Sequence, residues 1–125
     1  MLRRETAAGL LLMQIPTAVE ALSALAHASR LAVFRLLVRA GPDGMRAGEL
    51  AREVAALPNT LSSHLNILSH AGLIRARRDG RAILYSADYD AMRALLGFLM
   101  EDCCAGRPEI CAPLSELAVE AKCCP

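Results

Sequence analysis

The sequence predicts a mainly α-helical fold with one small β-hairpin, built as a single domain of 125 residues. Five segments carry apolar residues at helical spacing, and one segment alternates on either side of an Asp-Gly pair, which is a strong hairpin signal. The composition agrees with this, because it is 54% hydrophobic but only 3% aromatic. The core is therefore expected to consist of Leu, Ala, Val and Ile packed between helices.

Two helices are expected before the breaker cluster Gly-Pro-Asp-Gly at residues 41–44. The first opens at Pro16 or Thr17, and residues 27–29 break its pattern before a second helix over residues 30–40. Their apolar stripes are Val19, Leu22, Leu25 and Ala26 in the first, and Leu31, Phe34, Leu37 and Val38 in the second.

A third helix, over residues 47–57, and a fourth are expected on either side of Pro58. Asn59 is predicted to cap the fourth helix, because its side-chain oxygen can accept a hydrogen bond from the amides of the first turn. Gly72 is expected to end it in the left-handed conformation, with Leu73 folding back against it. The inward residues are Leu50, Val54 and Leu57 in the third helix and Leu61, Leu65 and Leu68 in the fourth, whose other faces carry Thr60, Ser62, Ser63, His64 and Asn66.

A hairpin is predicted next, from the run LIRARRDGRAILYS with a two-residue turn at Asp79-Gly80. Apolar residues alternate partially along it, at Ile74, Ala76, Ile83 and Tyr85, and the ribbon and its tip are crowded by Arg75, Arg77, Arg78 and Arg81. After Asp88, which can cap it, a last long helix is defined by Met92, Leu95, Leu96 and Leu99.

Charge is distributed unevenly along the chain, although the formal net charge is only +1. Residues 30–81 hold nine Arg against four acids, a balance of +5, whereas residues 82–125 hold three basic and seven acidic residues, a balance of −4. Thirteen of the fourteen basic residues are Arg, which suits forked contacts with phosphate. The middle of the chain therefore favours a polyanionic partner, and the C-terminal part does not.

The two helices around Pro58 meet the needs of a DNA reader. They are short, their turn is tight, and the second presents uncharged donors and acceptors suited to the major groove. Side chains such as Ser63 and His64 would read base edges, while the Arg-rich hairpin would follow the backbone or reach a minor groove. The candidate DNA-binding residues are Asn59, Thr60, Ser62, Ser63, His64, Asn66, Arg75, Arg77, Arg78 and Arg81. The alternative is that these are solvated faces of an ordinary helical domain.

Residues 48–88 closely resemble the winged helix-turn-helix of the ArsR family of metal-responsive repressors. The runs that carry the resemblance are GELAREVAALPNTLSSHLNILSHAGLI, with the S-H-L...L...A-G-L-I pattern of the family, and RARRDGRAILYSAD, with its wing. The likeness extends over roughly residues 17–104 and also includes the His27-Ala28-Ser29-Arg30 segment.

The resemblance implies a homodimer on double-stranded operator DNA with an inverted repeat, with the first and last helices packed across a twofold axis. The candidate interface residues are Val19, Leu22, Leu25, Leu95, Leu96 and Leu99, although an intrachain core would produce similar stripes.

The familiar sensing site of the family is absent from its usual place. Many arsenic-sensing members carry a C-V-C motif before the recognition helix, but residues 47–54 contain no cysteine. The three histidines, His27, His64 and His70, are also scattered, which disfavours a zinc site on the last helix, although Asp88, Asp90, Glu101 and Asp102 leave that alternative open. All five cysteines lie at or beyond the end of the last helix instead, as Cys103-Cys104, Cys111 and Cys123-Cys124, which resembles a subset of arsenic-responsive members.

Chemistry supports a three-cysteine site at Cys103, Cys104 and Cys111. Gly106 and Pro108 predict that the helix ends near Ala105, so that the loop can bring Cys111 back over the pair. Three thiolates suit pyramidal As(III) or Sb(III), whereas structural zinc prefers a fourth ligand. A disulfide between adjacent cysteines is disfavoured, because their Cα atoms lie ~3.8 Å apart and bridged residues need ~4.4 Å. The alternative is that these thiols are incidental.

The sequence thus predicts one domain, with a core over residues 17–104 and a Cys-containing tail over residues 105–125. Its expected function is that of a metalloid-responsive transcriptional repressor, whose homodimer leaves the operator when As(III), the inducer, binds Cys103, Cys104 and Cys111; Cys123 and Cys124 are further candidate ligands. No organic cofactor is expected. Sb(III), methylated As(III), Cd(II), Hg(II) or thiol oxidation are alternative signals. An enzyme such as an arsenate reductase is disfavoured, because no phosphate-cradling loop or nearby His accompanies the cysteines.

A cytoplasmic location is expected. No apolar run approaches the ~20 residues that cross a bilayer. The start of the chain, MLRRETAAGLLLMQ, lacks a convincing cleavage site and is interpreted as part of the folded protein. In that compartment thiols stay reduced, so a cysteine cluster favours metal binding or redox chemistry.

Overall fold

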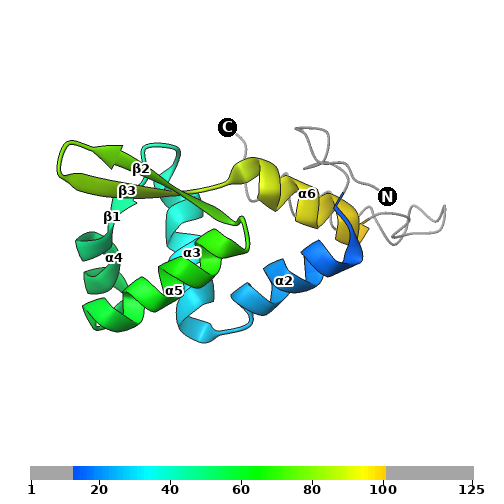
Figure 1. The fold of residues 1–125 in the computed structure, drawn as a ribbon, viewed down its shortest axis with the longest axis horizontal. Coiled ribbons are helices and arrows are strands. Elements are labelled where there is room, and N and C mark those ends of the chain that lie inside the picture. The colour runs from blue at the N-terminus through cyan, green and yellow to red at the C-terminus, as the bar shows by residue number, and fades with distance from the viewer. Residues whose placement is uncertain (1–12, 101–125) are drawn as a thin grey trace.

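The computed structural model describes residues 13–100, which form five helices and one antiparallel sheet (Figure 1). The elements are α2 (Ile15–Leu25), α3 (Ala28–Ala40), β1 (Met45–Arg46), α4 (Ala47–Val54), α5 (Pro58–His70), β2 (Ile74–Asp79), β3 (Ala82–Ala87) and α6 (Tyr89–Met100). The predicted fold class is confirmed. The tail over residues 105–125 and all five cysteines lie outside the described residues.

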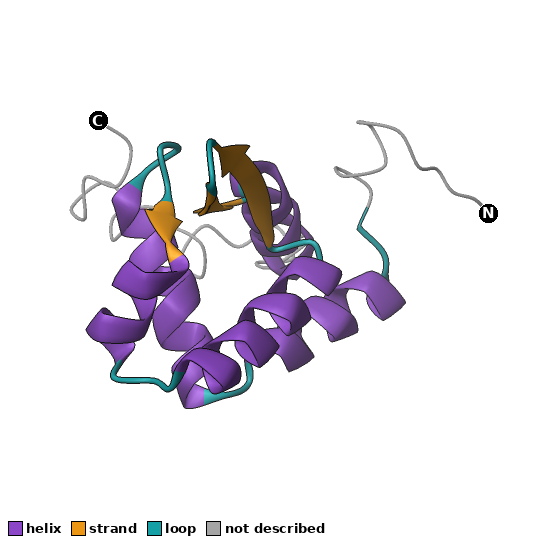
Figure 2. Ribbon diagram, turned by 60° about the vertical axis from the view of Figure 1, so that its left-hand side comes forward, coloured by secondary structure: helices purple, strands orange, loops and turns teal. Residues whose placement is uncertain are grey.

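The helices surround one core, with the sheet at its edge (Figure 2). Helix α5 packs against α2, α3, α4 and β2, and α2 also packs against α6. The largest fully buried side chains are Leu37, Leu50, Leu61, Leu68, Leu73 and Val33. As the composition predicted, aliphatic residues fill this core.

The sheet has the order β1-β3-β2, and its short first strand was not predicted. Met45 pairs with Tyr85, and the next residue pairs with Leu84. Two residues are too few for any alternation to be visible in the sequence. Gly44 permits the close approach, because its φ is 79° and a Cβ at this position would lie 2.4 Å from the Tyr85 carbonyl oxygen.

The end of α4 and the start of α5 differ from the prediction. Ala55 adopts the left-handed conformation with φ 53°, so α4 stops at Val54. Leu57 then lies outside the helix and is 74% exposed, not buried. Helix α5 begins at Pro58, which needs no amide partner at the first position, and Leu57 takes the N-cap place predicted for Asn59. Asn59 therefore lies within the first turn.

Two further boundaries are also shifted. Helix α3 starts at Ala28, because the Nδ1 atom of His27 accepts a hydrogen bond from the Ser29 amide at 3.2 Å. The hairpin turn is Gly80-Arg81, since Asp79 already pairs with Ala82. Gly80 has φ 65° at the first central position, as a type II′ turn requires.

The buried stripe of α3 also differs from the prediction. Leu31 was expected on it but is exposed.

The predicted end of α5 and the predicted start of α6 are correct. Gly72 has φ 81°, and the Leu73 amide donates to the Leu68 carbonyl at 3.1 Å, which completes a Schellman motif. Asp88 caps α6, because its Oδ1 atom accepts from the Ala91 amide at 3.0 Å.

Across residues 13–100 no single helix is long and apolar enough to cross a membrane. Helices α2 and α3 meet that criterion only together, with a 100° bend between them.

Candidate nucleic-acid interface

Most of the exposed side chains of α5 are polar and uncharged, although the apolar Ile67 is also 40% exposed. Five of the polar side chains, called the polar face of α5 from here on, are Asn59, Thr60, Ser62, Ser63 and Asn66. Leu61, Leu65 and Leu68 on the opposite side anchor the helix in the core. The fold therefore presents hydroxyl and amide groups, which can donate to and accept from base edges, on a helix held rigidly from behind.

His64 does not belong to that face, which corrects its predicted role as a base reader. It is only 7% exposed, and its ring packs on that of His27 with centroids 4.7 Å apart. Its Nδ1 atom is buried and has no hydrogen-bond partner among the described residues. Burial, followed by the nearby charges of His27 and Arg30, lowers the pKa of His64. Its spacing of three residues from Leu61 and four from Leu68 would have placed it on the buried stripe.

This environment predicts that acid weakens the folded state. In the folded chain the pKa of His64 lies below its ordinary value of 6.5, so the unfolded chain takes up protons more readily at this group. The contribution of neutral His64 to the free energy of unfolding is therefore fully present above pH 6.5, and this free energy is expected to fall as the pH drops below that value. Urea denaturation of the wild type at about pH 7.5 and 5.5 measures this loss.

His64→Gln is expected to reduce the pH dependence of the urea midpoint, whatever its midpoint at neutral pH. His70→Gln is the matched control on the same helix, because the His70 side chain is 87% exposed. An equal pH dependence in His64→Gln and the wild type would show that His64 is not the responsible group.

The β2–β3 hairpin, called the wing from here on, exposes its tip at residues 78–81. Arg78 and Arg81 make no hydrogen bond or ion pair with other residues in the described range 13–100. Both guanidinium groups are therefore free for phosphate oxygens. The wing contacts α5 through β2, so the hairpin and the helix that carries the polar face belong to one packed unit.

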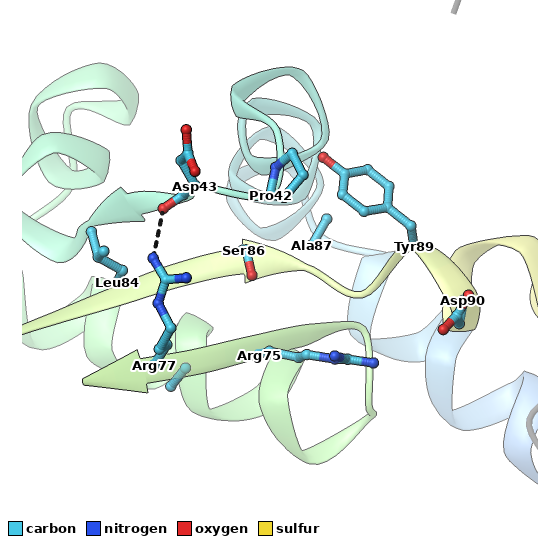
Figure 3. A pocket seen from close by; sticks show the side chains of 10 residues that line it. Pro42, Asp43, Arg75, Arg77, Leu84, Ser86, Ala87, Tyr89 and Asp90 are labelled. Carbon is cyan, nitrogen blue, oxygen red and sulfur yellow. Dashed lines mark hydrogen bonds between the residues drawn. The ribbon is translucent and has the colours of Figure 1, made fainter. Parts of the chain in front are cut away.

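Arg75 and Arg77 are also exposed, but each donates a hydrogen bond to another part of the protein; Figure 3 shows the two side chains. The Arg75 Nε atom donates to Asp88 Oδ2 at 3.0 Å, and an Arg77 terminal nitrogen donates to the Asp43 carbonyl at 3.5 Å. The hydrogen bond and the charge of Asp88 raise the pKa of Arg75. Both arginines line a pocket of about 540 Å³ whose walls also include the carboxylates of Asp43 and Asp90. This mixed charge is poorly suited to a phosphate.

Helices α2 and α6 expose a second kind of surface. They pack against each other (Figure 1), and each carries large apolar side chains toward solvent. The exposed predicted interface residues, called the apolar face of α2 and α6, are Val19, Leu22, Leu96 and Leu99. Leu25 is half-buried. Leu95 is buried in the core of the single chain, which corrects its assignment to a dimer contact. Such apolar faces mark interaction surfaces.

The predicted metalloid ligands, Cys103, Cys104 and Cys111 with Cys123 and Cys124, lie outside the described residues. Within residues 13–100, no three His, Cys, Asp or Glu side chains are grouped so that they could hold a metal ion. Asp88, one of the carboxylates that left a zinc site open, uses both of its oxygens within the protein.

Comparison with known proteins gives consistent results. Residues 25–77 match a helix-turn-helix domain family. The chain is 35% identical over 83 residues to the HTH-type transcriptional regulator YgaV of Escherichia coli strain K12, a match that covers 66% of this chain and 82% of that protein.

Solved structures share the fold. An ArsR family transcriptional regulator aligns with a TM-score of 0.60 and 28% identity, covering 70% of this chain and 89% of its own. A protein described as a possible transcriptional regulator for arsenical resistance aligns with a TM-score of 0.57 and 29% identity, covering 64% and 80%. At 24% identity, a homodimeric winged helix-turn-helix DNA-binding domain from Mycobacterium bovis shares the fold, with a TM-score of 0.55 and coverage of 82% and 92%.

Proposed function

The chain belongs to the ArsR family of winged helix-turn-helix transcriptional regulators, and on this premise we propose that it is a metalloid-responsive repressor. In this proposal a homodimer binds operator DNA and leaves it when As(III) binds three cysteines. The polar face of α5, together with the exposed arginines of the wing tip, carries the proposal. Enzymatic activity is not part of it, because the relatives of the chain are transcriptional regulators.

In the proposed complex α5 enters the major groove. Ser63 and Asn66 then form hydrogen bonds with base edges, for which amide and hydroxyl groups are suited. Arg78 and Arg81 contact the phosphate backbone or the adjacent minor groove, which strengthens binding without selecting the sequence. Arg75 and Arg77 are not included, because Asp88 and Asp43 already engage them.

A homodimer is proposed because the apolar face of α2 and α6 needs a partner. Its four side chains are exposed in the single chain, and a second copy would bury them symmetrically. The structural neighbour from Mycobacterium bovis is homodimeric. A twofold axis at this face would space two α5 helices for an inverted repeat, whose half-sites lie about 34 Å apart.

The inducer is proposed from the chemistry of the donor set. Cys103, Cys104 and Cys111 offer three soft thiolates, which suit trivalent arsenic. One structural neighbour is described as a possible regulator for arsenical resistance. Cys103 follows the last residue of α6 by only three positions, so the inducer would bind close in sequence to a helix of the proposed dimer interface. By linkage, DNA must weaken As(III) binding by the same factor as As(III) weakens DNA binding.

DNA binding is tested with a duplex that the reduced wild-type protein selects from a random library. Asn66→Ala is expected to weaken binding of this duplex about tenfold while leaving a scrambled duplex unaffected, because a base contact is lost. Arg81→Ala is expected to weaken both duplexes and to lower the salt slope of log Kd by about one, because a phosphate contact is lost. Fluorescence anisotropy at several salt concentrations measures both effects.

Arg35→Ala serves as the control, because Arg35 is an exposed arginine on α3 outside these surfaces. It should leave both affinities within about twofold of the wild type. Failure of the selection, or equal losses on both duplexes in Asn66→Ala, would contradict reading by the polar face of α5.

A further inference from the structure

Asp88 occupies the junction between the wing and α6, and both of its carboxylate oxygens are engaged. Oδ1 accepts from the Ala91 amide at 3.0 Å and caps α6, while Oδ2 accepts from Arg75 Nε in β2 at 3.0 Å. The backbone amide of Asp88 also donates to the Leu73 carbonyl at 2.8 Å. One residue thus joins the start of α6, the base of the wing and the segment that ends α5.

The geometry of this junction differs from that of an ordinary surface ion pair. The Asp88 side chain is only 13% exposed, although the Arg75 side chain is 62% exposed. The Arg93–Asp90 pair one turn along α6 is exposed at both partners and links residues of the same helix. A shielded, charge-assisted hydrogen bond between two elements restricts their relative orientation more than such a pair does.

The position of Arg75 in β2 connects this anchor to the wing tip. Arg75 pairs with Ser86 in the sheet, and the ladder continues without interruption to Asp79 and Ala82. Figure 3 shows the Arg75 side chain extended along β2 toward the start of α6, not toward the tip. This continuous two-stranded ladder connects the base of the wing to its tip, so a change in orientation at the base can reach the tip.

We propose that Asp88 and Arg75 are positioning residues that orient the wing tip on DNA, and that Arg75 is not itself a phosphate contact. The inference rests on the DNA-binding part of the proposed function. The junction also links α6 to the wing. If the first turn of α6 moves, Asp88 can no longer cap that turn and accept the hydrogen bond from Arg75 at the same time.

The opposite role for Arg75 makes a different prediction for the same two variants. If Arg75 contacts phosphate, Asp88→Ser releases it and tightens DNA binding, whereas Arg75→Met weakens binding and lowers the salt slope. If the pair positions the wing, Asp88→Ser and Arg75→Met weaken binding equally, and neither changes the salt slope. Serine still caps α6 but is too short to reach Arg75, so it removes only the link to the wing.

The test combines DNA affinity with a measurement on the free protein. With the selected duplex, we expect each variant and the double variant to weaken binding by the same factor, about three- to tenfold, at an unchanged salt slope. In the free protein, amide hydrogen exchange followed by NMR should rise about threefold or more in β2 and β3 of both variants, with α6 unchanged.

Additive losses, tighter binding by Asp88→Ser or a lower salt slope in Arg75→Met would overturn the proposal. Unchanged wing exchange in both variants would also overturn it, whether or not the protein binds DNA. By contrast, wild-type protein that selects no duplex contradicts the proposed function, while faster wing exchange in both variants would still support the structural link.

Discussion

Arsenite is expected to release DNA from the wild-type protein. At the same arsenite concentration, a Cys111→Ser protein is expected to stay bound to DNA. The serine hydroxyl stays protonated and hard, so the proposed site loses one of three soft ligands. Loss of an outer-shell partner of a metal site typically costs 10- to 100-fold in affinity, and loss of a direct ligand should cost more. We therefore expect the arsenite concentration for half-release to rise on the order of 100-fold or more.

The other two proposed ligands give parallel variants. Cys103→Ser and Cys104→Ser should resist arsenite in the same way as Cys111→Ser. As the control, all three variants should bind DNA like the wild type when no arsenite is present. Cys123→Ser with Cys124→Ser shows whether the last pair contributes. Sb(III), methylated As(III), Cd(II) and Hg(II) rank the inducers, and peroxide without metalloid tests the redox alternative. Release of the Cys111→Ser complex at the wild-type arsenite concentration would contradict the three-cysteine site.

Leu68→Ala is expected to reduce the free energy of unfolding by about 2–5 kcal/mol. Leu68 is 0% exposed in the centre of the core, and its truncation removes buried apolar surface and leaves a cavity. Ile67→Ala is the matched control in the neighbouring position of α5, where the isoleucine is 40% exposed. The control should lose about 1 kcal/mol or less, because much of this side chain already contacts water.

Urea denaturation at one fixed protein concentration measures both losses, since the proposed dimerisation would make the apparent stability concentration-dependent. Equal destabilisation by the two variants would mean that α5 is not seated as described. In that case the assignment of the polar face, which depends on which side of α5 is buried, would have to change.

Much of the fold could be predicted because its signals are local. Leu61, Leu65 and Leu68 recur at helical spacing, so the buried side of α5 follows from the sequence. Gly72 ends that helix because glycine adopts a positive φ at little cost, and Asp88 caps α6 because a carboxylate accepts from free amides. These residues determine local geometry largely on their own.

Other features depend on conformations or partners that no local pattern indicates. Ala55 adopts a positive φ that alanine rarely takes, so neither the early end of α4 nor the exposure of Leu57 could be predicted. Arg75 lies thirteen residues before Asp88, and the pair forms only because the hairpin brings the two together. A charge pattern alone assigned this arginine to DNA.

The polar face of α5 was largely predictable, and His64 was the exception. The residue type suggested base reading, but its position between Leu61 and Leu68 placed it on the buried stripe. The spacing was a better guide than polarity. The proposed inducer site differs in kind, because its three cysteines lie outside the described residues and their role is supported by donor chemistry and by resemblance.

The most direct test of a metalloid-responsive repressor is one anisotropy experiment on the reduced wild-type protein. The selected duplex is titrated with protein, and arsenite is then added to the same sample. We expect tight, saturable binding that a scrambled duplex does not reproduce, followed by a return to the anisotropy of free DNA. Equal binding of both duplexes, or a complex that persists in excess arsenite, would contradict the proposed function.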